Sequence, residues 1–384
     1  MFNNCDNCDI CEVYNGVVQD PSDNVYNNIY DSVKNNHPKC LLQLMQLDAG
    51  NVAKMSEKDW LNIIFMTIEL EHTECLGILM NADRDYNKCN KYGIIPIYTA
   101  VERNRYECLK MLLDAGYNPN QCDKNNFCLI YIAAKYGHDK CIELLLAAGG
   151  DPNKCDNYEI SPILCAAEKG HIKCLQLLLA AGGNANKCSI NGASPILCAT
   201  GMGHIKCLQL LLTAGGDPNK CCNDNGDSPI LCAANMGHIE CLQLLLAAGG
   251  NANKCRNNGT SPILCAAARG HDECMQMLLV AGGDPNKCND NGDSPILCAA
   301  NMGHIECVQL LLTAGGDPNK CNDNGFSPIL CAVSNNHIDC IQLLLDANVD
   351  TNQCNVFGLS LISIASKNGH AECMQLLLAA GCWL

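Results

Sequence analysis

Aromatic side chains and positive charges are both scarce in this sequence. Phenylalanine, tryptophan and tyrosine make up 5% of the 384 residues, and 25 basic side chains stand against 40 acidic ones. No run of about 18 apolar residues occurs, so we expect no membrane-spanning helix. The acidic excess lies in residues 1–89 and 222–384, so no segment is basic enough to follow a phosphate backbone. We therefore expect neither a membrane nor a nucleic acid as partner.

A secretory signal is also missing from the first residues. The string MFNNCDNCDICEVYNG carries acids and amides where a signal peptide has a basic and then an apolar segment. The 32 cysteines would suggest a disulfide scaffold in a short secreted chain. Without a secretory signal, we expect a cytoplasmic protein with reduced thiols.

What the sequence does contain is a repeat. The string Ser-Pro-Ile-Leu-Cys-Ala begins at Ser161 and returns at a spacing of 33 or 34 residues. A period of this length predicts a solenoid of stacked units. The copies allow about 11 units to be traced: 22–56, 57–89, 90–122, 123–155, 156–188, 189–221, 222–255, 256–288, 289–321, 322–354 and 355–384.

Each unit has the same predicted local structure. In unit 156–188, Ser161 is a good N-cap and Pro162 suits the first helical position, so a short helix is expected up to residue 169. A second, largely apolar helix is expected over 172–181, ended by two glycines. Asn191-Gly192, at the start of the next unit, indicates a β-hairpin finger. One unit cannot bury its apolar helix alone, so the units must stack.

These motifs resemble the ankyrin repeat family. The resemblance rests on Asn-Gly-x-Ser-Pro-Ile-Leu-x-Ala-Ala-x-x-Gly-His and the later Leu-Leu-Leu-x-Ala-Gly-Gly-Asp-Pro-Asn, which recur in phase. The family's Thr-Pro-Leu-His is Ser-Pro-Ile-Leu here, and cysteine replaces a core aliphatic residue in each helix. The resemblance implies an all-α, cysteine-rich solenoid of helix-turn-helix units with β-hairpin fingers. We expect a polar, cysteine-containing tail at 1–21, degenerate capping units at 22–89, regular repeats at 90–354 and a truncated repeat at 355–384.

The most regular chemical pattern is His-x-x-Cys, which accompanies all ten histidines, as at His171 and Cys174. Residues three apart share a helix face, so the spacing is acceptable for metal ligands. The alternative, which we favour, is that the family resemblance gives the histidine a role in linking neighbouring units. The cysteine then fills the core as a small apolar side chain. We expect no metal and no other cofactor.

Two further sets of cysteines suggest a metal-binding or redox alternative. One cysteine ends each unit, at positions 89, 122, 155, 188, 221, 255, 288, 321 and 354. Units lie about 10 Å apart, whereas a disulfide needs Cα atoms within about 7 Å, so we expect these thiols to stay unbridged. Cys5, Cys8 and Cys11 form a separate cluster in the tail, with no histidine before His37 as a fourth ligand.

Catalytic motifs are missing from the sequence. It contains no GxxxxGK[ST] loop, no HExxH, no GxSxG and no kinase signature. A cysteine–histidine pair repeated ten times indicates a scaffold position, because an active site would be single. We therefore expect a protein that is not an enzyme.

One asparagine after each second helix resembles the sites at which ankyrin repeats are hydroxylated. The alternative is that its side chain only forms hydrogen bonds in the turn. The positions are Asn153, Asn186, Asn219, Asn253, Asn286 and Asn319.

The family resemblance places the partner site on a concave surface formed by the fingers and the first helices. Positions that vary between units on that surface are candidates for binding, and the acidic ones suit a basic, partly apolar partner segment. The alternative is that these acids only keep the protein soluble. The candidates are Tyr158, Asp224, Asp227, Met236, Asp290, Asp293, Met302, Asp323 and Phe326. The sequence thus predicts a monomeric, non-catalytic scaffold for protein–protein interaction, with a soft-metal or redox thiol protein as the alternative.

Overall fold

The computed structural model describes residues 24–47, 49–82, 88–90, 93–123, 126–220, 225–352 and 358–382. Within these ranges every regular element is a helix, and strand pairing is limited to one isolated bridge between Cys122 and Cys128. The chain divides into two compact parts. We call residues up to Asn184 the N-terminal part and residues from Ala185 the C-terminal part.

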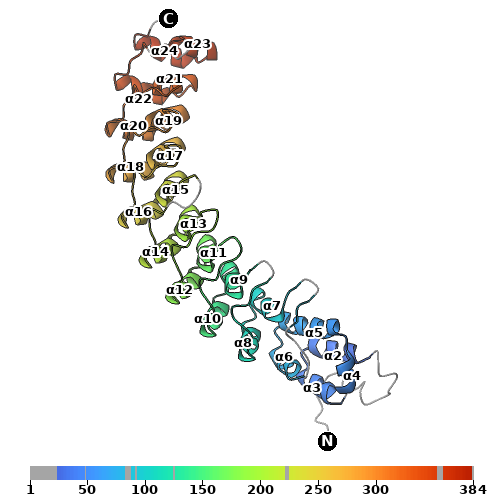
Figure 1. Ribbon diagram of the computed structural model, residues 1–384. Coiled ribbons are helices and arrows are strands. Elements are labelled where there is room, and N and C mark those ends of the chain that lie inside the picture. The colour runs from blue at the N-terminus through green and yellow to red at the C-terminus, as the bar shows by residue number, and fades with distance from the viewer. Residues whose placement is uncertain are drawn as a thin grey trace. The chain divides into compact units, whose positions relative to one another are not determined.

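The N-terminal part contains paired helices and one extra short helix, α4, which packs on α2 and α3 (Figure 1). Within each later pair the helices contact each other, and each helix also contacts its counterpart in the next pair. The helices are α2 (Asn24–Lys34), α3 (Pro38–Leu47), α4 (Ala49–Lys54), α5 (Glu57–Glu69), α6 (Thr73–Met80), α7 (Pro96–Glu102), α8 (Tyr106–Asp114), α9 (Leu129–Tyr136), α10 (Asp139–Ala147), α11 (Pro162–Lys169) and α12 (Ile172–Ala180).

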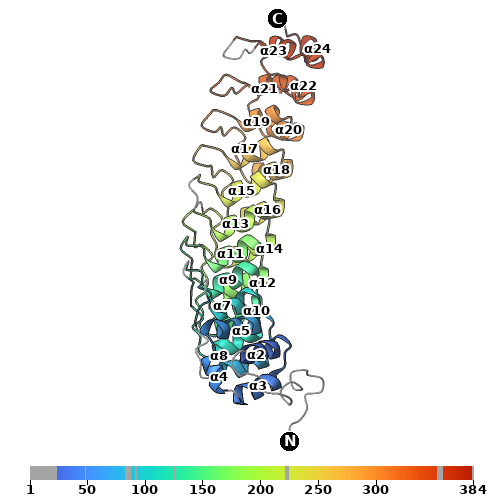
Figure 2. The same ribbon diagram turned by 90° about the vertical axis from the view of Figure 1, so that its right-hand side faces the viewer.

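The C-terminal part repeats one arrangement. Its odd-numbered helices, from α13 to α23, are the first helices of the units and stack in one row beside the turns that connect the units. Its even-numbered helices, from α14 to α24, are the second helices and form the neighbouring row (Figure 2). The helices are α13 (Pro195–Gly201), α14 (Ile205–Thr213), α15 (Pro229–Met236), α16 (Ile239–Ala247), α17 (Pro262–Arg269), α18 (Asp272–Val280), α19 (Pro295–Met302), α20 (Ile305–Thr313), α21 (Pro328–Ser334), α22 (Ile338–Asp346), α23 (Leu361–Asn368) and α24 (Ala371–Ala379).

Helix starts and ends follow the sequence signals. The hydroxyl of Ser161 accepts a hydrogen bond from the N–H of Leu164 at 3.1 Å, which caps α11, and Pro162 is the first helical residue. Gly170 ends α11 in the left-handed conformation, at φ 74°. The second helix ends at Ala180, one residue earlier than expected.

The expected β-hairpin fingers are five-residue turns where all five residues are described, and we call them tip turns: 156–160, 189–193, 256–260, 289–293 and 322–326. In each, the N–H of the first residue donates to the carbonyl of the fifth, as from Asn289 to Asp293 at 3.1 Å. Gly292, the fourth residue, has φ 78°, which explains the Asn-Gly signal. The turn closes on one such bond without forming paired strands, so the hairpin itself is not confirmed.

Successive units are joined by the asparagine that follows each second helix. Asn253 donates from Nδ2 to the carbonyl of Gly282 at 2.9 Å, and its Oδ1 accepts from the N–H of Asp284 at 2.8 Å. Asn286 makes the same two bonds to Gly315 and Asp317, at 2.9 and 2.7 Å. Each amide therefore satisfies two backbone groups of the next unit. These side chains do form hydrogen bonds, but to the next unit and not within their own turn, and their hydroxylation stays a prediction.

The core lies between the rows of helices. Ile163 and Leu175 are fully buried, whereas Leu177 and Leu179 are half-buried. Packing against the neighbouring units thus removes most, but not all, of the apolar second helix from water. None of the described helices is long and apolar enough to cross a membrane.

Candidate functional site

The histidines of the His-x-x-Cys pattern link neighbouring units. Nδ1 of His138 donates to the carbonyl of Val101 in the preceding unit at 2.8 Å, and the thiol of Cys141 donates to Oδ1 of Asn104 at 3.5 Å. Asn104 itself occupies the left-handed position after α7, at φ 57°. Both members of the pattern are therefore engaged across the unit boundary, which confirms the structural interpretation.

Where glycine takes that left-handed position, the histidine bonds differently. Nε2 of His337 donates to the carbonyl of Asn301 at 3.1 Å. The imidazole packs so closely on Gly303 that a Cβ there would lie 2.6 Å from Nδ1 of His337. The same close packing recurs between Gly270 and His304. Glycine is thus required at these positions both by its φ and by the ring of the next unit.

The thiols give no support to the metal-binding alternative. Among the described residues, no group of three or more histidine, cysteine or acidic side chains is placed to hold a metal ion. Burial raises the pKa of Cys141 and of Cys307 to about 12, and that of Cys174 to about 11. Such thiols stay protonated at neutral pH, whereas the thiolate is the metal ligand and the nucleophile. Cys5, Cys8 and Cys11, and the whole tail at 1–21, lie outside the described residues.

One cysteine contradicts the expected absence of disulfides. Cys188 is disulfide-bonded, and its partner lies outside the described residues. The other described cysteines are not in disulfides. The expectation was based on the spacing of helices, but turns of neighbouring units approach more closely. For example, the N–H of Asn257 donates to the carbonyl of Asn225 at 3.0 Å.

The sequence-predicted binding residues are divided between the two parts of the chain. Tyr158 lies on a tip turn of the N-terminal part and is 57% exposed. Asp224 lies outside the described residues. Met236 is exposed at the end of α15, and Asp290 and Asp323 are exposed on successive tip turns.

Three of the predicted residues do line one groove in the C-terminal part. Asp293, Met302 and Phe326 surround a space of about 390 Å³ between tip turns 289–293 and 322–326 and the first helices α19 and α21. Met302 is 55% exposed, and Phe326 is half-buried. We call this space the 293–326 groove. The remaining lining residues are Ala268, Leu297, Cys298, Asn301, Asn322, Cys331 and Ser334.

The groove combines one acid with apolar and sulfur-containing walls. Oδ1 of Asp293 accepts from Nδ2 of Asn322 at 2.8 Å, and Oδ2 accepts from Nδ2 of Asn289 at 3.1 Å. Both donors are neutral amides, so these bonds hold the carboxylate in place without adding a positive charge. Burial raises the pKa of Cys298 and of Cys331 to about 12, so both thiols are neutral. The groove therefore suits an apolar side chain beside a positive charge.

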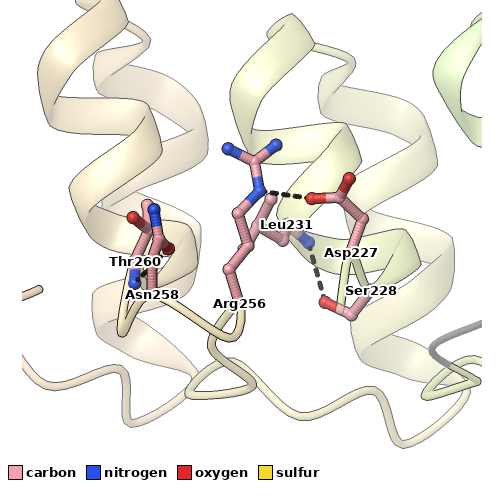
Figure 3. A network of polar contacts seen from close by, with 6 residues as sticks. All are labelled: Asp227, Ser228, Leu231, Arg256, Asn258 and Thr260. Atoms are coloured by element: carbon pink, nitrogen blue, oxygen red, sulfur yellow. Dashed lines mark hydrogen bonds and ion pairs between the residues drawn. The ribbon is translucent and has the colours of Figure 1, made fainter. Parts of the chain in front are cut away.

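Asp227 differs from the other predicted acids because it is already paired. Nε of Arg256, on the following tip turn, forms an ion pair with Oδ1 of Asp227 (Figure 3). The two side chains are 31% and 17% exposed, so the pair is largely shielded from water. Asp227 thus joins two units, and the row of acids expected along the fingers is interrupted at this point.

The sequence reasoning did not select Arg256 as a candidate. The sequence signal that could have identified it is a basic residue at the first position of a tip turn. Other units have Asp156, Ser189, Asn289 and Asn322 at this position. The groove residues Cys298 and Cys331 were not selected either, because cysteine stands at this position in every unit from 156–188 to 322–354. Asn301 was not selected although its position varies, with glutamate, glycine, alanine and serine in other units.

These features define the class: stacked two-helix units joined by tip turns, that is, a repeat protein of the solenoid type. A family model described as "Ankyrin repeats (3 copies)" matches residues 29–123, 130–220, 207–287 and 264–355. The chain therefore belongs to the ankyrin-repeat family. A search of curated proteins finds no match to it.

Proposed function

We propose that this protein is a non-catalytic scaffold that binds a protein partner through the 293–326 groove. Ankyrin repeats in general mediate protein–protein interaction. The observation that supports this location is the convergence of Asp293, Met302 and Phe326 on one apolar-walled space. Exposed apolar side chains around a few fixed polar groups are typical of binding surfaces.

The proposed partner segment carries a positive charge beside an apolar side chain. Asp293 contributes the negative charge, and Asp290 and Asp323 add two more on the exposed tip turns. Acids one unit apart lie about 10 Å from each other, close to the Debye length of about 8 Å at physiological salt, so their fields partly reinforce one another. We further propose that the protein acts as a monomer in the cytoplasm, because the described cysteines other than Cys188 are free thiols, which suits a reducing compartment.

Capture and cross-linking of partners by the full chain and by its variants tests the location of the site. The double variant Met302→Ser/Phe326→Ala should lose the partners, because it removes the apolar walls of the groove. Met236→Ser is the matched control, since Met236 ends α15 as Met302 ends α19 but does not line the groove. Retention of the same partners by the double variant would place the binding site elsewhere.

A further inference from the structure

Arg256 is not needed to close its own tip turn. In the turns that follow, an asparagine side chain does this: Oδ1 of Asn289 accepts from the N–H of Asp293 at 2.9 Å. Arginine has no acceptor atom. In turn 256–260 the Oδ1 of Asn258 takes over, accepting from the N–H of Thr260 at 3.2 Å (Figure 3). The arginine side chain is therefore available for a different role.

The guanidinium of Arg256 is held by one nitrogen only. Nε is paired with Asp227, whereas the two terminal nitrogens point away from the turn (Figure 3). Among the described residues these two nitrogens have no hydrogen-bond partner. The side chain is 31% exposed, so solvent and a ligand can reach it. Fixed on one edge, the guanidinium presents a two-nitrogen fork whose geometry matches a carboxylate or a phosphate.

A second arginine adds positive charge to the same unit. Arg269 is exposed at the last residue of α17. Burial raises the pKa of Cys265 to about 11, and the charges of Arg256 and Arg269 both act to lower it. Arg269 ends α17, the helix that directly follows tip turn 256–260, so both arginines belong to one turn-and-helix segment. Residues 185–384 contain no other arginine.

The charge changes sign from this unit to the next. Unit 256–288 presents Arg256, which is paired with Asp227, and Arg269, whereas unit 289–321 presents Asp290 and Asp293 beside the 293–326 groove. The groove reaches back to Ala268, the residue before Arg269, so the positive and negative regions adjoin. A purely basic partner segment would meet repulsion at unit 256–288. A segment that carries both signs would match both units.

We propose that Arg256 and Arg269 form an anion-binding subsite for the same partner segment, a proposal that rests on the proposed function. It takes an acidic group, either the carboxylate of Asp or Glu or a phosphorylated side chain. Units lie about 10 Å apart, and an extended chain rises about 3.3 Å per residue. The acidic group therefore stands about three residues from the basic and apolar residues that enter the groove. Asp227 positions Arg256 for this contact.

Selection of displayed random peptides by the full chain tests both proposals. Peptides that bind the wild-type chain but not the Met302→Ser/Phe326→Ala variant are those that occupy the groove. Among these peptides, the subsite predicts an acidic residue about three positions from the basic one. A failure to select any groove-dependent peptide would contradict the proposed function. Groove-dependent peptides without an acidic preference would contradict the subsite alone.

Variants of the two arginines then test the contact itself. Synthetic versions of a selected peptide would carry glutamate, phosphoserine or serine at the acidic position. Wild type should bind the two charged versions at least tenfold more tightly than the serine version, and the stronger of the two identifies the source of the anion. Arg269→Gln, and Arg256→Lys, which keeps the charge beside Asp227 but removes the fork, should each reduce this ratio severalfold.

Lys320→Gln is the control, because it removes the same charge as Arg269→Gln from the same part of the chain, away from Cys265. It should leave the ratio unchanged. Circular dichroism and the melting temperature of each variant separate a lost contact from lost folding. A ratio near one in wild type, or an equal ratio in wild type and both arginine variants, would overturn the subsite.

Discussion

At the scale of single residues, the polar side chains of the tip turns show what spacing alone leaves open. The first residue of each turn was visible in the sequence, but its bonds were not. Asn322 reaches back to Asp293, whereas Arg256 pairs with Asp227, and each contact crosses from one unit to another. Such contacts depend on the length and rotamer of both side chains. For this reason the sequence selected Asp227 as a free acid and did not select Arg256.

Asp156 provides a test at this scale. It is 5% exposed; Oδ1 accepts from the N–H groups of Tyr158 and Ile160, and Oδ2 is buried without a partner. A buried polar atom that lacks a partner costs about 1–3 kcal/mol. Asp156→Asn keeps the two bonds and removes the charge, so we expect the free energy of unfolding to rise by about 1 kcal/mol.

The control for Asp156→Asn is the reverse change at the equivalent position. Nδ2 of Asn289 donates to Asp293, so Asn289→Asp would place two carboxylates together and should lower stability. Urea unfolding of the two variants measures both effects. A stabilised Asn289→Asp, or a destabilised Asp156→Asn, would contradict this account.

At the scale of helices, the ends of the elements were the best predicted feature. Ser161, Pro162 and Gly170 each occupy the expected position, because capping depends on residues close in sequence. The form of the histidine contact was not predictable, since it depends on the left-handed residue one unit earlier. When asparagine holds this left-handed position, the next histidine donates its hydrogen bond from Nδ1, as His138 does. When glycine holds it, the histidine donates from Nε2, as His337 does.

Gly303 tests this dependence. Gly303→Ala places a Cβ 2.6 Å from the ring of His337 at φ 77°, so it should destabilise by more than the left-handed conformation alone, which costs about 1–2 kcal/mol. Gly315→Ala is the control, because Gly315 has φ 83° and open space around it. Equal losses of stability in the two variants would contradict the role of the ring.

At the scale of the whole molecule, the repeat and its phase were predictable because every unit carries the same signals. The disulfide of Cys188 was not, because it departs from the repeated pattern. Two consequences of the stacked arrangement can be measured directly.

Deleting residues 289–321 should leave a folded, shorter protein. The contacts of α19 and α20 are with neighbouring units, and the flanking α17 and α21 carry the same Pro-Ile-Leu-Cys-Ala surface. Circular dichroism should show helical content per residue close to that of the full chain. A collapse of the helical signal would contradict nearest-neighbour stacking.

The buried thiols predict a loss of stability in alkali. Unfolded cysteines ionise near pH 9.0, whereas burial raises the pKa of folded Cys141 and Cys307 to about 12. The unfolded state therefore binds fewer protons above pH 9, and stability falls as the pH rises toward 12. Urea unfolding under reductant between pH 8 and 11 measures this, and Cys141→Ala/Cys307→Ala should flatten the dependence. A stability that is constant over this range would contradict it.

Hydrogen exchange of a captured partner complex tests the central claim, that the 293–326 groove is the binding site. Amides of tip turns 289–293 and 322–326 and of the adjoining ends of α19 and α21 should exchange more slowly in the complex than in the free chain. The amides around Tyr158 and Lys169 in the N-terminal part should exchange at the same rate in both. Protection confined to Tyr158 and Lys169, with no change at the groove, would contradict the claim.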